Sequence, residues 1–391
     1  MANARRLAKR AGVGAVASVA VLGLAATIPT SAAEELQDVF AAGDESSTGE
    51  AAAAGEWREA FAAKGMDVMY TSLAAADAEN VWALGSQYPD DSDTPRTFVQ
   101  RYDGAEWTQE EVPADWTLEP EVAGASGPDN VWVVGPTADG VGAIRYDGTD
   151  WTSHEMDAGL TPNDLDVIAE DEAWLLAEDA AGETRAVRFD GEIWRDWTSP
   201  PAGTSQAIDG IDGETVVAVG RNDASQPSAA LYDGTEWTDL EVPEVELPSE
   251  IASATFNDVL VRAGDDIWAV GYVHDLNDDD INDYWPLTAH YDGQSWDVTV
   301  DEEPSGELVA VEDDGAGGVW IQEESWDPTF VHHDAAGEVT RDTPDIENYD
   351  LNVRDLALIP GTEALVSAGS AYDEGDPDVP TGYGVVLASG L

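Results

Sequence analysis

Short apolar runs separated by turn-forming residues follow one another along most of the chain. Runs such as residues 81–84 (Val-Trp-Ala-Leu) and 131–134 (Val-Trp-Val-Val) are apolar on both faces of an extended strand. A strand of this kind has to be covered on both sides, as in a stack of packed sheets. Asp or Asn precedes the runs, as at residues 129–130, and predicts a turn from an earlier strand. The pattern therefore predicts an all-β chain.

A second motif follows each apolar run. It reads Tyr-Asp-Gly-x-x-Trp at residues 102–107 and 146–151. Asp-Gly predicts a two-residue type I′ hairpin turn, in which both central residues have positive φ. The Tyr and the Trp flank the turn and are placed to pack across the two strands. Together with the turn before the apolar run, this gives four strands in each unit.

The units repeat at propeller-blade spacing. Their anchor positions lie about 42 to 52 residues apart, at residues 82, 132, 174, 217, 268, 320 and 366. The sixth unit has Asp334-Ala335 in place of Asp-Gly and no Trp after it, and the seventh keeps only residues 365–369 and 383–388. We predict a β-propeller of seven four-stranded blades. Six blades with an irregular terminal region is the alternative.

The two ends of the chain supply the parts that the last blade needs. The seventh unit has three apparent strands and no Asp-Gly motif, whereas Gly55-x-Trp57 precedes the first complete unit. Gly-x-Trp matches the tail of the missing motif. We therefore expect residues 55–62 to form the outer strand of the last blade. This would close the ring without a disulfide, and the chain has 0 Cys.

The N-terminal segment differs from the rest of the chain. A basic stretch (Arg5, Arg6, Lys9, Arg10), an apolar stretch and small residues at positions 30–33 predict a secretory signal peptide over residues 1–33. Residues 34–54, rich in Ala, Glu, Gly and Ser, predict a flexible leader. Residues 55–391 then form a single propeller domain, and the protein is expected to be secreted. No later stretch is long and apolar enough to span a bilayer.

The charge balance limits the partners. The chain has 81 Asp plus Glu against 16 Lys plus Arg, a formal net charge of −65. Such a surface repels phosphate backbones and anionic membranes, so nucleic acid and membrane partners are excluded. Metal cations and basic proteins remain, and strong self-repulsion favours a monomer.

The repeat motifs resemble those of secreted actinobacterial propellers of the broad kelch and galactose-oxidase-like type. The resemblance rests on Asp-Asn-Val-Trp-Val-Val-Gly (residues 129–135) followed by Tyr-Asp-Gly-Thr-x-Trp (residues 146–151), and it covers roughly residues 55–391. It implies the fold and a binding or scaffold role. The double-Gly turn of kelch repeats is absent, and the Tyr–Cys cross-link of galactose oxidases is impossible without Cys.

The aromatic and imidazole side chains give few catalytic candidates. The five His residues form no His-Glu-x-x-His motif. His290 and His333 occupy or adjoin the position of Tyr102 in the repeat, so we interpret them as packing substitutes. Trp residues at repeat positions are expected in the core. Three lie off the repeat and are the candidates for exposed stacking: Trp116, Trp285 and Trp326.

An acidic insertion in the fifth unit is the candidate metal site. Within residues 275–283, oxygen ligands alternate at Asp275, Asn277 and Asp279, as at the start of a calcium loop. Asp280 replaces the loop glycine and Pro286 stands where an EF-hand has Glu, so the motif is not an EF-hand. No cofactor is assigned with certainty: calcium is the ion expected if this loop binds a metal, and a solvated acidic loop is the interpretation that competes with it. The acidic residues 90–93 occupy the equivalent place in the first unit.

Two functions remain open at this point. The first is a non-enzymatic extracellular binding or scaffold propeller, with a glycan or a protein as ligand and with a cation as possible support. The second is an extracellular glycan hydrolase or lyase that uses a carboxylate pair in the central pocket. The loss of motifs in units six and seven favours the first, because no unit has gained a recognisable catalytic insertion. No catalytic residue is assigned.

Overall fold

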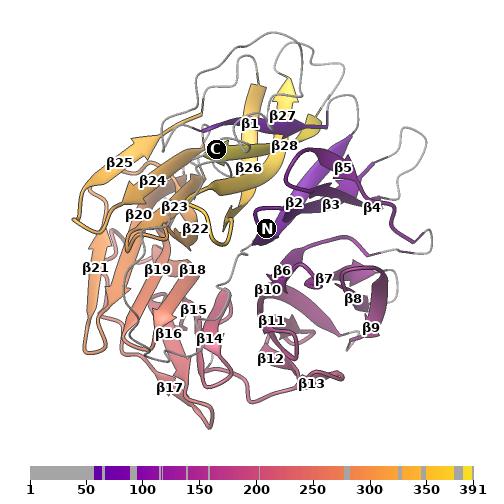
Figure 1. The fold of residues 1–391 in the computed structure, drawn as a ribbon. Coiled ribbons are helices and arrows are strands. Elements are labelled where there is room, and N and C mark those ends of the chain that lie inside the picture. The colour runs from indigo at the N-terminus through magenta and orange to yellow at the C-terminus, as the bar shows by residue number, and fades with distance from the viewer. Residues whose placement is uncertain are drawn as a thin grey trace, which may run out of the picture.

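A ring of β-sheets makes up the part of the chain described by the computed structural model. The described residues are 57–63, 67–88, 95–113, 116, 118–137, 140–156, 159–201, 203–276, 282–324, 328–344, 349–373 and 382–389. They form seven four-stranded antiparallel sheets, arranged as the blades of a propeller (Figure 1). No helix among these residues is long and apolar enough to cross a membrane. The predicted signal peptide and leader lie outside the described residues.

Each blade runs from an inner to an outer strand in chain order, except the last. Blades 1 to 4 contain β2 (Val68–Asp77), β3 (Asn80–Gln87), β4 (Arg96–Tyr102), β5 (Trp107–Gln109); β6 (Val122–Gly127), β7 (Asn130–Thr137), β8 (Gly140–Tyr146), β9 (Trp151–Glu155); β10 (Leu160–Ala169), β11 (Glu172–Asp179), β12 (Thr184–Phe189), β13 (Trp194–Asp196); and β14 (Ala207–Asp212), β15 (Thr215–Arg221), β16 (Pro227–Tyr232), β17 (Trp237–Asp239). Blades 5 to 7 contain β18 (Ser253–Ala263), β19 (Asp266–Leu276), β20 (Asn282–Tyr291), β21 (Trp296–Val300); β22 (Glu307–Asp313), β23 (Val319–Glu324), β24 (Thr329–His333), β25 (Val339–Asp342); and β26 (Tyr349–Leu358), β27 (Leu365–Asp373), β28 (Gly382–Ser389), β1 (Arg58–Ala62).

The N-terminal strand closes the ring, as predicted. β1 pairs with β28 in antiparallel register, from Arg58 opposite Ala388 to Ala62 opposite Val385, and lies along the outer edge of blade 7 (Figure 1). Trp57, just before β1, reaches into blade 6, where its ring stacks on Phe330 at 3.6 Å between centroids. The prediction of seven blades is confirmed, and the six-blade alternative is wrong.

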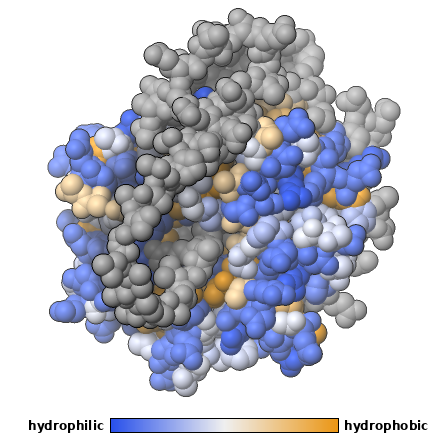
Figure 2. All heavy atoms as spheres, viewed as in Figure 1, coloured by the Kyte–Doolittle hydropathy of each residue, from blue (hydrophilic) through white to orange (hydrophobic). Residues whose placement is uncertain are grey.

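The hydrophobic core is divided among the blade interfaces. Each of the seven clusters of buried apolar residues combines side chains from two neighbouring blades. This explains why the inner strands are apolar on both faces, since each face contacts a different neighbour. Hydrophilic residues dominate the outer surface that Figure 2 shows.

The repeated Trp residues build these interfaces. Trp82, Trp132 and Trp174, on the second strands, are 0% exposed. The Trp at the start of the outer strand packs against the second-strand Trp of the preceding blade, at centroid distances of 5.1 Å for Trp194 and Trp132, 6.3 Å for Trp237 and Trp174, and 6.3 Å for Trp57 and Trp320. The assignment of these residues to the core is confirmed.

Buried carboxylates near the centre of the ring tie neighbouring blades together. Asp164, Asp258 and Asp355 are 0% exposed, and each directly follows a β-bulge in its inner strand. One carboxylate oxygen accepts the next N–H of the same strand, and the other accepts an N–H of the next blade. The donors, at 2.7–2.9 Å, are Leu165 and Ile208 for Asp164, Val259 and Val311 for Asp258, and Leu356 and Leu73 for Asp355.

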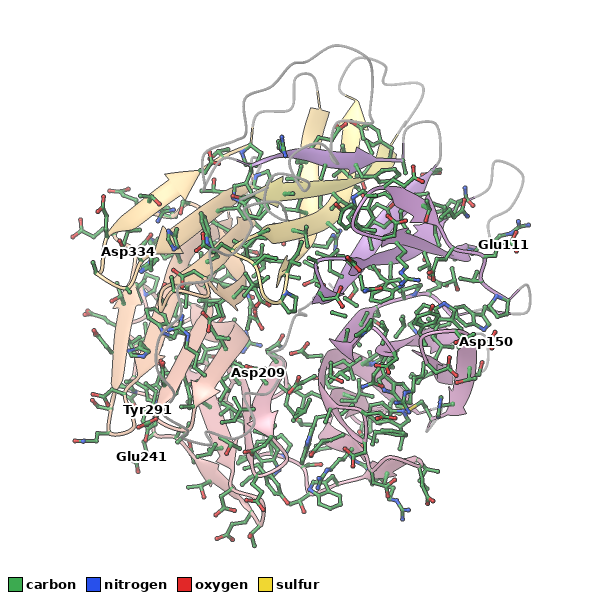
Figure 3. The ribbon with its side chains drawn as sticks, in the orientation of Figure 1. Glu111, Asp150, Asp209, Glu241, Tyr291 and Asp334 are labelled. Atoms are coloured by element: carbon green, nitrogen blue, oxygen red, sulfur yellow. The ribbon has the colours of Figure 1, made fainter. Side chains whose placement is uncertain are left out.

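Two further aspartates extend these links. Asp166 accepts the N–H of Gly210 at 2.9 Å, and Asp209 accepts the N–H of Val261 in blade 5. Figure 3 shows Asp209 next to the centre of the ring, whereas Glu111, Asp150 and other labelled acids lie at its periphery. Hydrogen bonds to a charged group contribute about 1.5–3 kcal/mol each. The interfaces from blade 3 to blade 6, and that between blades 7 and 1, are therefore held by charge-assisted bonds.

The Asp-Gly turns differ from the prediction. Tyr102 pairs directly with Trp107, so the turn has four residues and not two. Gly104 has φ of 89°, but Asp103 does not have positive φ, because Ser225 is the only described non-glycine residue that does. Instead, the Asp103 carboxylate accepts the N–H groups of residues 105 and 106 at 2.9 Å, and these bonds hold its pKa below the ordinary value. The type I′ prediction was wrong because it ignored this side-chain cap.

Candidate functional site

The inner strands begin on one face of the ring, and the loops between second and third strands lie on the same face. The predicted calcium loop is the loop between β19 and β20. Asp275 lies in β19, opposite Asp283 of β20, and accepts a hydrogen bond from Ser249 Oγ at 2.6 Å. Asn277 and Asp279 lie outside the described residues, as do residues 90–93. The calcium site stays a prediction.

Two glutamates face each other on this side of the ring. Glu307 begins β22, and Glu324, which ends β23, is its direct partner across the two strands. Burial, followed by the negative charge of Glu324, raises the pKa of Glu307 to about 7. Within the part of the chain that the structure describes, neither carboxylate has an ion-pair partner. No cationic side chain among the described residues therefore neutralises the negative charge of this pair.

Aromatic rings of blade 5 lie beside this pair. The Tyr284 ring stacks on His274 with 4.4 Å between centroids and an interplanar angle of 0°, and Tyr272 meets it edge-on at 5.2 Å. Burial, Glu307 and Glu324 all raise the pKa of the Tyr284 hydroxyl. This coupling shows that the phenol and the two carboxyl groups share one electrostatic environment.

Blade 7 completes the site with polar groups. Asn352 donates a hydrogen bond from Nδ2 to Glu324 Oε1 at 3.3 Å, and the Asn352 Oδ1 atom accepts one from Arg354 Nε at 2.6 Å. The first of these bonds holds the Glu324 carboxylate in place. We call Tyr284, Glu307, Glu324 and Asn352 the Glu307 cluster. It offers carboxylate acceptors and an aromatic ring, the groups that recognise a cation.

Blades 7, 1 and 2 carry a related arrangement on the same face. Burial and the charge of Glu119 raise the pKa of Glu121. Burial, Glu119, Asp67 and Tyr372 raise the pKa of Tyr88. Tyr88 and Tyr372 are 36% and 38% exposed. Carboxylates and tyrosines therefore occur together at two places around the mouth of the ring.

The other sequence-based candidates serve mainly in packing. His290 stacks on Trp268 at 4.6 Å, and His333 meets the same ring at 6.1 Å, so their interpretation as packing residues is confirmed. Trp116 and Trp285 are half-buried and pack against core clusters. The prediction that they are exposed was wrong, because neighbouring blades cover them. Trp326 lies outside the described residues.

Sequence reasoning missed the Glu307 cluster. With 81 acidic residues in the chain, no spacing rule selects residues 307 and 324. The selection depends on strand register and on burial between three blades. The only available signal was that Glu324 lies four residues after the anchor position 320 of the sixth unit.

No protein-family model and no curated protein sequence matches the chain. Several solved structures share its fold. The structure of YCF48 bound to D1 peptide is 12% identical with a TM-score of 0.55, covering 87% of this chain and 97% of that one. Virginiamycin B lyase from Staphylococcus aureus is 11% identical with a TM-score of 0.55, covering 85% and 99%.

A third similar structure is Chaetomium thermophilum Sqt1 bound to the N-terminus of the ribosomal protein L10. It is 12% identical with a TM-score of 0.51, covering 80% of this chain and 86% of that one. At this level of identity the comparisons show the seven-bladed propeller fold alone. They include both peptide-binding proteins and a lyase.

Proposed function

We propose that this protein is an exported, non-enzymatic binding propeller that holds a basic segment of a protein partner at the Glu307 cluster. The observation that carries the proposal is the raised pKa of Glu307, about 7, beside Glu324. A Lys or Arg side chain placed between the two carboxylates would stabilise both in the ionised form. The neighbouring Tyr284 ring adds an aromatic face for the same cation.

Three further observations support this proposal. The net charge of −65 attracts basic segments and speeds their encounter. YCF48 and Sqt1, which share the fold, are bound to peptide segments of other proteins. Export is proposed from the basic and apolar character of residues 1–33, and membership of the kelch and galactose-oxidase-like type stays a proposal from the repeat motifs.

The test is calorimetric titration with a lysine-rich peptide at 0.15 M ionic strength or above, where the Debye length is about 8 Å or less. Glu307→Gln/Glu324→Gln is compared with Glu106→Gln/Glu236→Gln, two exposed acids in the strand-three to strand-four turns on the opposite face. At a pH well above 7, where Glu307 is also ionised, both variants change the net charge equally. The first is expected to weaken binding by about tenfold or more, and the second by less than about twofold. Equal effects would show that attraction is non-specific.

The same cluster supports a second candidate function, a glycan hydrolase or lyase. A carboxylic acid with a pKa of about 7 next to an ionised carboxylate is the arrangement that acid–base catalysis uses. Virginiamycin B lyase is among the proteins of similar structure. This candidate is tested by incubating the protein with a panel of polysaccharides and measuring the new reducing or unsaturated ends that chain cleavage produces. Cleavage by the wild-type protein that is lost in Glu307→Gln would favour the enzyme. No cleavage of any polysaccharide by the wild-type protein would favour the binding protein.

A further inference from the structure

The interface between blades 5 and 6 departs from the packing repeated around the ring. In the repeat, a Tyr or Phe on the third strand and a Trp on the fourth cover the second-strand Trp of the preceding blade. In blade 6, His333 occupies the Tyr position and Val339, which is 49% exposed, occupies the Trp position. The buried cluster of this interface is aliphatic, whereas every other described cluster contains a buried aromatic residue.

The missing ring leaves a pocket. Its volume is about 360 Å³, within the range of roughly 300–1,000 Å³ common for small-molecule sites. Trp268 lines it and is half-buried, although the equivalent Trp82, Trp132 and Trp174 are fully buried. Among the described second-strand Trp residues, Trp268 alone is partly uncovered, since Trp320 of blade 6 is also buried.

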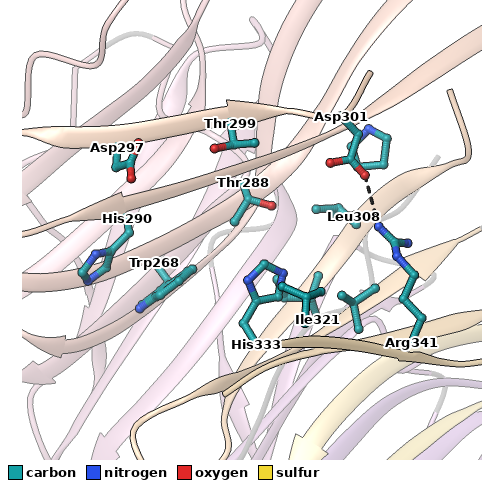
Figure 4. A pocket seen from close by; sticks show the side chains of 13 residues that line it. Trp268, Thr288, His290, Asp297, Thr299, Asp301, Leu308, Ile321, His333 and Arg341 are labelled. Atoms are coloured by element: carbon teal, nitrogen blue, oxygen red, sulfur yellow. Dashed lines mark hydrogen bonds and ion pairs between the residues drawn. The ribbon is translucent and has the colours of Figure 1, made fainter. Parts of the chain in front are cut away.

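The walls of the pocket have two characters (Figure 4). Trp268, Leu308, Ile321 and Val331 give an apolar side. Toward the outer strands of the two blades the lining carries hydroxyl and charged groups: Thr288, Asp297, Thr299, Asp301 and Arg341. A ligand that fits both sides has one apolar face and several hydrogen-bonding groups along its edge.

One ion pair across the interface and one within blade 6 hold Arg341 on the polar side. Arg341 of blade 6 donates to Asp301 of blade 5 at 3.1 Å and to Glu323 at 2.7 Å. A guanidinium group has five N–H donors, so some remain for a ligand. Its charge is balanced by these carboxylates, and Asp297 adds a further negative charge. The pocket therefore disfavours an anion and offers both donors and acceptors to an uncharged polar molecule.

We propose that the pocket between blades 5 and 6 is a saccharide-binding site. One face of a pyranose ring carries C–H groups, which would pack on Trp268. The ring hydroxyls would accept hydrogen bonds from Arg341 and donate to Asp301, with Thr288 and Thr299 serving in either role. Burial and the neighbouring Arg341 lower the pKa of His333, which favours a neutral imidazole with one N–H donor and one nitrogen acceptor. The site shares no residue with the Glu307 cluster and does not depend on the proposed function.

The test is saturation-transfer NMR on the full chain with the methyl glycosides of glucose, galactose, mannose, fucose and N-acetylglucosamine. At least one glycoside is expected to show transfer, concentrated on the C–H groups of one ring face. Val339→Trp restores the ring of the repeat, so it should fill the pocket and abolish the signal. Ile251→Trp, at a residue that is 63% exposed and outside the pocket, adds the same ring elsewhere and should keep the signal.

A second variant guards against misfolding of Val339→Trp. Asp301→Asn keeps the shape of the side chain and removes its charge, and it should weaken glycoside binding by about tenfold. The proposal is overturned if no glycoside of the panel binds, or if binding survives in both Val339→Trp and Asp301→Asn. It is also overturned if N-acetyltryptophanamide binds in the pocket while every glycoside fails, because the site would then recognise an aromatic side chain.

Discussion

Replacing Trp57 with Ala tests the closure of the ring. Trp57 is 7% exposed, stacks on Phe330 and meets Trp320 edge-on at 6.3 Å. Its backbone N–H bond to Asp342, at 2.9 Å, is retained in the variant, so the substitution removes only the ring. Burial of about 200 Å² of aromatic surface at roughly 25 cal/mol per Å² gives about 5 kcal/mol. Buried Trp→Ala substitutions cost about 3–5 kcal/mol, so we expect a loss of about 4 kcal/mol.

Equilibrium urea unfolding, followed by near- and far-ultraviolet circular dichroism, measures this loss. Coincidence of the two signals establishes that the ring unfolds as one unit. Trp197→Ala is the matched control, because Trp197 is 36% exposed and its loss should cost about two thirds as much. A loss below about 1 kcal/mol for Trp57→Ala, or one no greater than that of the control, would refute closure by the N-terminal segment.

Three further perturbations test other parts of the structure. Asp258→Ala removes the acceptor of the Val259 and Val311 N–H groups and should lower the free energy of unfolding in urea by about 2–5 kcal/mol. Asp258→Asn keeps one acceptor oxygen and should lower it by about half as much; equal, small effects of the two variants would count against the links between blades. Folding raises the pKa of Glu307 from 4.5 to about 7, so the folded protein binds this proton more tightly than the unfolded chain does. The wild-type protein should therefore lose stability relative to Glu307→Gln as the pH rises from about 4.5 to 7, and parallel curves of stability against pH would contradict this. Calcium added after EDTA at constant ionic strength should raise the unfolding temperature, and Asp275→Asn/Asp279→Asn should abolish the rise; an unchanged midpoint in wild type would show a solvated acidic loop.

Much of the fold could be predicted because a propeller is a local repeat. Each unit carries its own turn residues and apolar run, so blade number and spacing follow from the positions of the Trp residues. The Gly-x-Trp motif at residues 55–57 even predicted the closing strand, since it is a fragment of the same repeat. The Asp-Gly turns were assigned to the wrong type because the dipeptide alone does not show how the Asp side chain is used.

Features between blades could not be predicted in this way. Asp164 bonds to an N–H in the next blade, 44 residues away, and this depends on a bulge that aims the carboxylate across the interface. The unusual Glu307 owes its pKa to burial and to Glu324 on a neighbouring strand. The loss of Trp in the sixth unit was visible in the sequence, but the pocket that results requires the packing of blade 6 on Trp268.

The pKa of Glu307, measured by carbon-13 NMR titration of the side-chain carboxyl with and without a saturating lysine-rich peptide, tests the proposed binding site most directly. Assignment comes from Glu307→Gln, and Glu324→Gln reports the contribution of the neighbouring charge. The proposed binding site predicts a pKa of about 7 for Glu307 in the free protein, a lower pKa in Glu324→Gln, and a fall toward the ordinary value when the peptide is bound. An ordinary pKa in the free protein, or one that the bound peptide leaves unchanged, would contradict it.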